Sequence, residues 1–144
     1  LHTAYRRQRQ MCIRDRHATR RYLLQVLERQ VKALAECQHE SGLWHTLLDD
    51  RDAYLEASAT AGFAYGILKA VRKRYLSRDY YPVAERALKG VMEHINDDGE
   101  LTQVSFGTAM GSDLDYYRQI PLTSMPYGQA MALLCLTEYL RVYL

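Results

Sequence analysis

The chain has 144 residues, of which 48% are hydrophobic and 25% are charged. This is the size of one domain with enough apolar side chains for a real core, which excludes a disordered polypeptide. The net charge of +2 combines +6 over residues 1–21 with −4 over the remainder. The acidic body argues against a nucleic-acid-binding protein, although the basic N-terminal segment alone has the composition of a phosphate-binding arm.

No run of eighteen uncharged apolar residues occurs, and no apolar segment follows the N-terminal arginines. We therefore expect neither a membrane span nor a secretory signal, and a cytoplasmic protein. Cys12, Cys37 and Cys135 are an odd number without metal-ligand spacing, so reduced thiols are expected, with Cys135 buried and no metal or cofactor bound. Residues 11–16 look like translated adapter sequence from an assembled gene. We accordingly divide the chain into residues 1–16, a segment foreign to the fold, and residues 17–144.

The hydrophobic pattern predicts four helices. Residues 18–38 and 83–95 have apolar side chains at three- and four-residue steps, as in amphipathic surface helices. Residues 54–75 carry small side chains on almost every face, and the helix that begins at Pro126 is apolar on nearly every face, so both should be interior. A short strand is expected at residues 101–106, followed by a long loop from 107 to 125.

The predicted order of helices is outer, inner, outer, inner, which is typical of a toroid of helical hairpins. Both long connections, residues 39–52 and 97–125, run from an outer helix to an inner helix. In an up-and-down toroid they must lie on the same face, where binding residues are usually found.

Two motifs carry a resemblance to a known family: Gly42-Leu43-Trp44-His45, and the YLEASATA sequence of residues 54–61. With the second long loop and the last helix, they make residues 17–144 similar to glycoside hydrolase families 88 and 105, the unsaturated glucuronyl and rhamnogalacturonyl hydrolases. The resemblance implies an all-α fold, part of a six-hairpin α/α barrel, of which this chain is the last two or three hairpins. The N-terminal half of that barrel would be missing.

The resemblance also implies a reaction. Family members use an aspartate to protonate the C4=C5 double bond of an unsaturated uronic acid and to activate water, and the resulting hemiketal opens to release the sugar. That aspartate and an Arg/Trp motif lie upstream of the matched region, so no catalytic residue is carried over. The implied ligand is an unsaturated uronyl oligosaccharide, and the chain alone should be inactive.

Eight residues are candidates for contact with a sugar: Trp44, His45, Glu56, Ser58, Ser105, Tyr116, Tyr117 and Arg118. Six of them, all but Ser105 and Arg118, have a structural alternative. Trp44 suits either a stacking platform or a plug of the barrel rim, and Glu56 either a polar cleft role or a partner of the helix dipole. The two tyrosines could pack at the rim, and the hydroxyl of Ser58 could bond back along its helix.

Two other functions remain open. A non-catalytic helical-hairpin scaffold would present a concave binding surface, but its loops should recur at a fixed interval, and these two loops differ. Another sugar-active α/α-barrel enzyme would act on saturated sugars. If the chain is a fragment, it should leave Leu133, Leu134, Phe63 and Ile67 exposed where missing hairpins would pack.

Overall fold

The computed structural model describes the backbone of residues 2–143 and the side chains of residues 16–141. Helices dominate, joined by loops that carry two short antiparallel strand pairs. The elements in chain order are α1 (His2–Cys37), β1 (Trp44–His45), β2 (Leu55–Glu56), α2 (Ala57–Arg72), a 3-10 turn (Arg78–Tyr80), α3 (Tyr81–Glu93), β3 (Val104–Ser105), α4 (Leu114–Arg118), β4 (Leu122–Thr123) and α5 (Pro126–Tyr143). None of the helices within the described residues has the length and apolar character needed to cross a bilayer.

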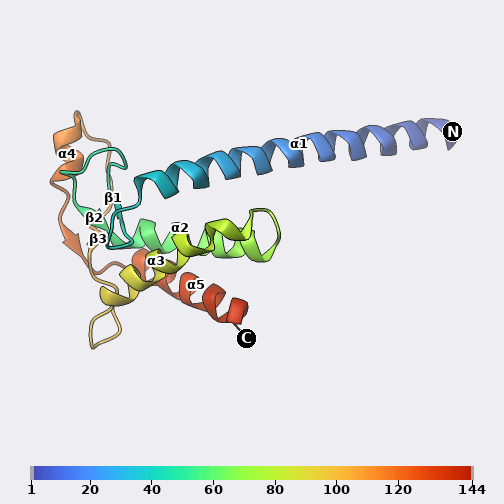
Figure 1. Ribbon diagram of the computed structural model, residues 1–144. Helices are drawn as coiled ribbons and strands as arrows, with labels where there is room; N and C mark the ends of the chain where they lie inside the picture. The colour runs from blue at the N-terminus through green and yellow to red at the C-terminus, as the bar shows by residue number, and fades with distance from the viewer. Residues whose placement is uncertain (1, 144) are drawn as a thin grey trace.

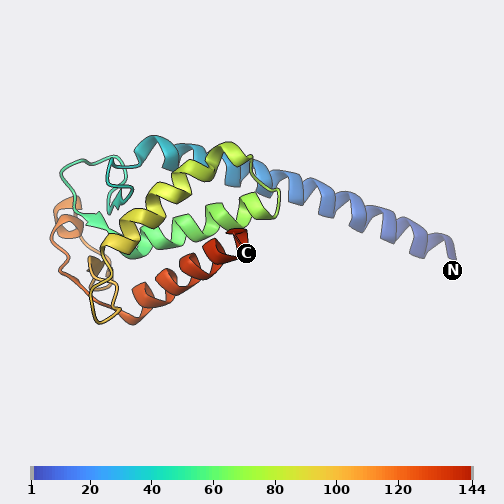
Figure 2. The same cartoon turned by 60° about the horizontal axis from the view of Figure 1, so that its bottom comes forward.

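Helix α2 is the centre of the arrangement, with α3 packed on one side of it and α5 on the other (Figures 1 and 2). The second half of α1 joins this group through Val31 and Leu34, which are buried in the core. The first half of α1 projects beyond the other helices in both views. The predicted boundary at residue 17 therefore falls inside a continuous helix.

The prediction that α2 is interior is confirmed by its burial. Eight of its residues are buried, and five of these are alanine or serine: Ala57, Ser58, Ala61, Ala64 and Ala70. Small side chains let the neighbouring helices approach closely, and the hydroxyl of Thr60 is satisfied by donating to the backbone oxygen of Glu56 at 2.6 Å. The core around α2 extends to Trp44 and Leu43 from the first loop and Leu101 and Val104 from the second.

Helix α2 begins at Ala57, not at residue 54 as predicted. Residues 55 and 56 instead form β2, which pairs with β1 in the register Trp44↔Glu56 and His45↔Leu55. Glu56 is the N-cap, with its carboxylate accepting from the backbone N–H of Ala59 at 2.5 Å. Helix α2 also ends three residues early, because Arg74 takes the left-handed conformation (φ 58°) that terminates helices.

The two long loops lie at the same end of the helices, as predicted (Figure 1). The second loop is more ordered than expected, since α4 and β4 occupy part of the segment that was expected to be a plain loop. Asp113 caps α4 by accepting from the N–H of Tyr116 at 3.0 Å, and β4 pairs with β3. The strand predicted over residues 101–106 is reduced to β3 and an isolated bridge between Leu101 and Ile95.

Helix α5 is less buried than its apolar sequence suggests. One stripe, which includes Ala132 and Cys135, faces α2, whereas Leu133, Leu134 and Leu140 are 57%, 42% and 54% exposed. The expectation of an interior helix is therefore wrong for this chain, because no described element covers the outer faces of α5. The predicted exposure of Leu133 and Leu134 is correct. Ile67, expected to be exposed, is buried, and Phe63 is half-buried.

Candidate functional site

A pocket of about 480 Å³ opens at the loop end of the helices. It contains four of the predicted site residues, contributed by β1, β2, α2 and β3: His45, Glu56, Ser58 and Ser105. We call it the central pocket. Its other lining residues are Thr46, Leu48, Ala59, Phe63, Gly107, Thr108 and Tyr127.

The Glu56 carboxylate organises the floor of the central pocket. It is 5% exposed and accepts three hydrogen bonds, from the Ser58 hydroxyl at 2.7 Å, the Ala59 N–H at 2.5 Å and the Ser105 N–H at 3.1 Å. Since Ser105 lies 49 residues further along the chain, this one side chain fixes the second loop against the start of α2. Glu56 thus caps α2 and also lines the pocket, and a role in ligand binding stays a prediction.

Two tyrosines hold Ser105 from the other side. The Tyr54 hydroxyl is 2.9 Å from the Ser105 hydroxyl, and the Tyr127 hydroxyl donates to the Ser105 backbone oxygen. Tyr127 also accepts from the Gly107 N–H at 3.3 Å, so it connects the start of α5 to the second loop. Part of the pocket wall therefore carries linked hydroxyl groups, which suits hydrogen bonding to a polyhydroxylated ligand.

His45 presents a free ring nitrogen beside this network. Its Nδ1 lies 2.5 Å from the backbone oxygen of Ala53, and because a carbonyl oxygen only accepts, Nδ1 carries a proton. Within the described residues Nε2 has no hydrogen-bond partner. In the neutral imidazole it is an acceptor, which a sugar hydroxyl can use.

Trp44 does not face the pocket. It is 1% exposed, its indole N–H donates to the Leu34 oxygen at 2.8 Å, and its ring meets Phe63 edge-on at 5.3 Å. Such burial leaves no ring face on which a sugar can stack, so the structure favours the packing alternative.

The three candidates on α4 lie beside the central pocket and do not enter it. Tyr116, 40% exposed, lines a separate cavity of about 330 Å³ that shares Gly107 with the central pocket. The Tyr117 hydroxyl accepts from the Gly111 N–H at 3.0 Å, which is a packing role. Arg118 donates hydrogen bonds to Asp50 at 2.7 Å and to Asp115. These two bonds hold the pKa of Arg118 above its usual value, and the bond to Asp50 links the two long loops.

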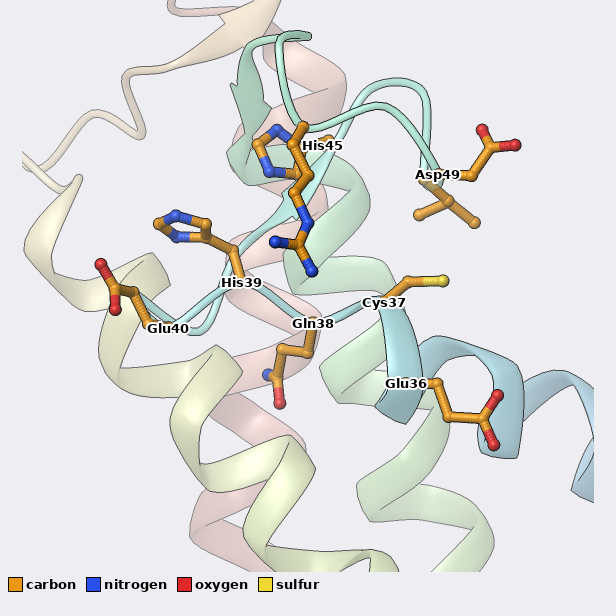
Figure 3. Close-up of a pocket in the computed structure, with 9 residues that line it drawn as sticks. Glu36, Cys37, Gln38, His39, Glu40, His45 and Asp49 are labelled. Carbon is orange, nitrogen blue, oxygen red and sulfur yellow. The ribbon is translucent and has the colours of Figure 1, made fainter.

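A third cavity, of about 590 Å³, extends the central pocket toward the end of α1. It shares His45 and Leu48 with the central pocket. Figure 3 shows His45 and Asp49 on one side of it, with Glu36 and Cys37 at the end of α1 opposite. The loop end thus carries a row of three connected cavities, with His45 and Gly107 at the junctions.

No group of three or more His, Cys, Asp or Glu side chains that could hold a metal ion is found in the described part of the chain. The polar groups of the pocket are hydroxyls, a histidine and a buried carboxylate whose two oxygens both accept hydrogen bonds, and Leu48, Ala59 and Phe63 add apolar surface. This arrangement can bind and orient a neutral or hydroxyl-rich group.

Sequence reasoning missed Tyr54 and Tyr127. A two-residue alternation was available for Tyr54, since it lies just before β2 and two residues before Glu56. Tyr127 follows Pro126 at the first turn of α5, at the loop end, where its hydroxyl could have been expected.

The fold and pocket define a helical-hairpin protein whose loop-end site combines hydroxyl groups with apolar surface, an arrangement suited to carbohydrate. The chain belongs to glycosyl hydrolase family 88, whose model matches residues 9–143. It is 36% identical over 116 residues to the unsaturated rhamnogalacturonyl hydrolase YesR of Bacillus subtilis (strain 168).

Solved structures agree with this assignment. A possible member of the GH105 family from Klebsiella pneumoniae subsp. pneumoniae MGH 78578 is 72% identical, with a TM-score of 0.86 over 88% of this chain. A family 105 glycoside hydrolase from C. acetobutylicum ATCC 824 is 29% identical, with a TM-score of 0.75 over 83% of this chain. The matches span 32% of YesR and 33% and 38% of the two structures, so this chain covers about one third of each relative.

Proposed function

We propose that residues 17–144 are the C-terminal part of an unsaturated rhamnogalacturonyl-type hydrolase with a six-hairpin α/α barrel. The complete enzyme would release 4,5-unsaturated uronic acid from pectin-derived oligosaccharides by hydrating the C4=C5 double bond. The observation that carries this proposal is the hydroxyl-rich central pocket at the loop end, in a chain 36% identical to a hydrolase of this specificity. Its missing partner is the N-terminal part of the barrel.

The chain alone should be inactive. Hydration needs a group that delivers a proton to one carbon of the double bond while water adds to the other. Within the described residues, the only carboxylate that lines the central pocket is Glu56, and both of its oxygens are occupied by donors. We propose that the pocket binds and orients the sugar, with Nε2 of His45 accepting from a hydroxyl group, and that the proton donor lies upstream.

A chimaera tests the proposal. Residues 17–144 replace the matching third of the Klebsiella pneumoniae relative, and turnover of an unsaturated rhamnogalacturonan disaccharide is followed by loss of its ultraviolet absorbance. The parent relative and this chain alone are assayed in parallel. We expect turnover by the chimaera and none by the chain alone, and no turnover of the saturated disaccharide, measured by release of reducing sugar.

Other outcomes separate the alternatives. Turnover of the saturated disaccharide only would indicate another sugar-active barrel enzyme. An inactive chimaera beside an active parent would favour the non-catalytic scaffold, and turnover by the chain alone would contradict the upstream proton donor.

The role of His45 has its own test in the chimaera. His45→Ala should raise KM about tenfold with a smaller effect on kcat, because a binding hydrogen bond is lost. The matched control is His94→Ala, since His94 also has its Nδ1 at a backbone oxygen, that of Gly90 at 2.7 Å, but does not line the pocket. Equal effects of the two variants would contradict a direct role for His45.

A further inference from the structure

A second large cavity lies at the end of the helices opposite the loops. Its volume is about 850 Å³, and it shares no lining residue with the central pocket. Figure 2 shows the short connection between α2 and α3 next to the C-terminus at this end. The lining residues come from that connection and from the ends of α2, α3 and α5: Val71, Arg72, Arg74, Leu76, Arg78, Tyr81, Pro82 and Arg141. We call it the arginine cavity.

Four guanidinium groups line the arginine cavity, and one carboxylate, that of Glu138, is paired with them. Glu138 is 1% exposed; its Oε1 accepts from Nε of Arg72 at 2.5 Å, and its Oε2 is 3.6 Å from Nη1 of Arg141. The side chain of Arg141 is 62% exposed, and this longer contact is the only one that holds it within the described residues. The cavity therefore carries three positive charges that Glu138 does not neutralise.

Arg74 and Arg78 supply the uncommitted donors. Both are exposed, and within the described residues neither side chain has a hydrogen bond or an ion pair. Arg74 has φ 58°, a conformation that costs a residue with a side chain about 1 kcal/mol relative to glycine. Terminating α2 would thus be easier with glycine at this position, and the guanidinium has no structural role that offsets the cost.

We propose that the arginine cavity binds a small polyvalent anion whose phosphate or carboxylate oxygens accept from Arg74 and Arg78. Guanidinium groups bind such oxygens in a two-pronged geometry, and Arg72 and Arg141 retain N–H groups for the same ligand. The apolar wall of Val71, Leu76 and Pro82 lowers the local dielectric constant and strengthens these bonds. This site is independent of the proposed hydrolase function.

Isothermal titration calorimetry of the 144-residue chain tests the site, at constant ionic strength, with pyrophosphate and citrate as probes and acetate as a monovalent reference. We expect saturable binding of at least one polyvalent anion and none of acetate. The double variant R74A/R78A should weaken binding about tenfold or more, since a lost charge-assisted hydrogen bond has that magnitude. Which probe binds identifies the ligand as a phosphate or a carboxylate.

The matched control is R29A/K89A, which removes two exposed positive charges outside the cavity. It should change affinity less than about twofold. A loss equal to that of R74A/R78A would mean nonspecific attraction and overturn the proposal. So would the absence of saturable binding to either probe.

The variant Arg74→Gly separates binding from folding. Glycine relieves the left-handed backbone, so thermal unfolding should occur at the same or a higher temperature while anion affinity falls. Unchanged affinity in a folded Arg74→Gly variant would overturn the assignment of Arg74 to the site.

Discussion

Replacing Glu56 with glutamine should destabilise the fold, because the carboxylate serves three donors at once. One oxygen accepts from the Ser58 hydroxyl and the Ser105 N–H, and the other accepts from the Ala59 N–H. An amide can keep its oxygen toward the first two, but its NH₂ group then faces the Ala59 N–H. Two donors oppose each other in a site where the side chain is 5% exposed.

The magnitude follows from these bonds. Losing one charge-assisted hydrogen bond costs about 1.5–3 kcal/mol, and the N–H left without a partner adds part of its desolvation penalty. We therefore expect Glu56→Gln to lower the free energy of unfolding by about 2–4 kcal/mol. Urea unfolding followed by circular dichroism measures the change, with the exposed Glu93→Gln as control. A loss within about 0.5 kcal/mol of that control would refute the reasoning.

Three further predictions concern backbone, thiol and charge. Gly42→Ala should lower the free energy of unfolding, measured in urea, by about 3 kcal/mol or more, because φ is +88° and the new Cβ would lie 2.1 Å from a backbone oxygen of α3. The control Gly99→Ala, with φ +80° but open space around the new Cβ, should lower it by only about 1 kcal/mol. Equal losses in the two variants would contradict the clash. Cys135 should resist alkylation by iodoacetamide until the chain is unfolded, since burial raises the pKa of its thiol to about 12. Peptide mass spectrometry measures the labelling, and equal labelling rates in the native and the unfolded chain would contradict this prediction. The hydrogen bond from Arg118 lowers the pKa of Asp50. The wild type should therefore be more stable than Asp50→Asn near neutral pH, and this difference should disappear as the pH falls below about 4. A difference that grows on acidification would contradict the prediction.

The helices could be predicted because their burial is local and periodic. The apolar spacing of residues 18–38 and the small residues of α2 determine which faces are covered, whatever the detail of the loops. The start of α2 was missed because non-local contacts set it. Residues 55 and 56 are drawn into a strand pair by β1, and Glu56 is held by Ser105 from the distant second loop.

The order of the helices also predicts where four of the candidate residues lie. His45, Glu56, Ser58 and Ser105 meet because the loops share one end, which the order of the helices predicts. The orientation of Trp44 could not be read from the sequence, since an aromatic residue in a loop has no period. Trp44 is buried against α1, where its indole N–H donates a hydrogen bond to the backbone oxygen of Leu34.

Two features of the chain agree with the upstream hairpins that we propose. Leu133, Leu134 and Leu140 are exposed on α5, although the helix is apolar enough for an interior position. The central pocket has hydroxyls and a histidine that we propose orient a sugar, yet both oxygens of its single carboxylate already accept hydrogen bonds within the described residues. A further set of hairpins packed on α5 would cover the leucines and bring new side chains to the loop end. The segment that we propose to supply the proton donor is therefore the one whose packing on α5 would complete the core, so restoring it should improve stability and activity together.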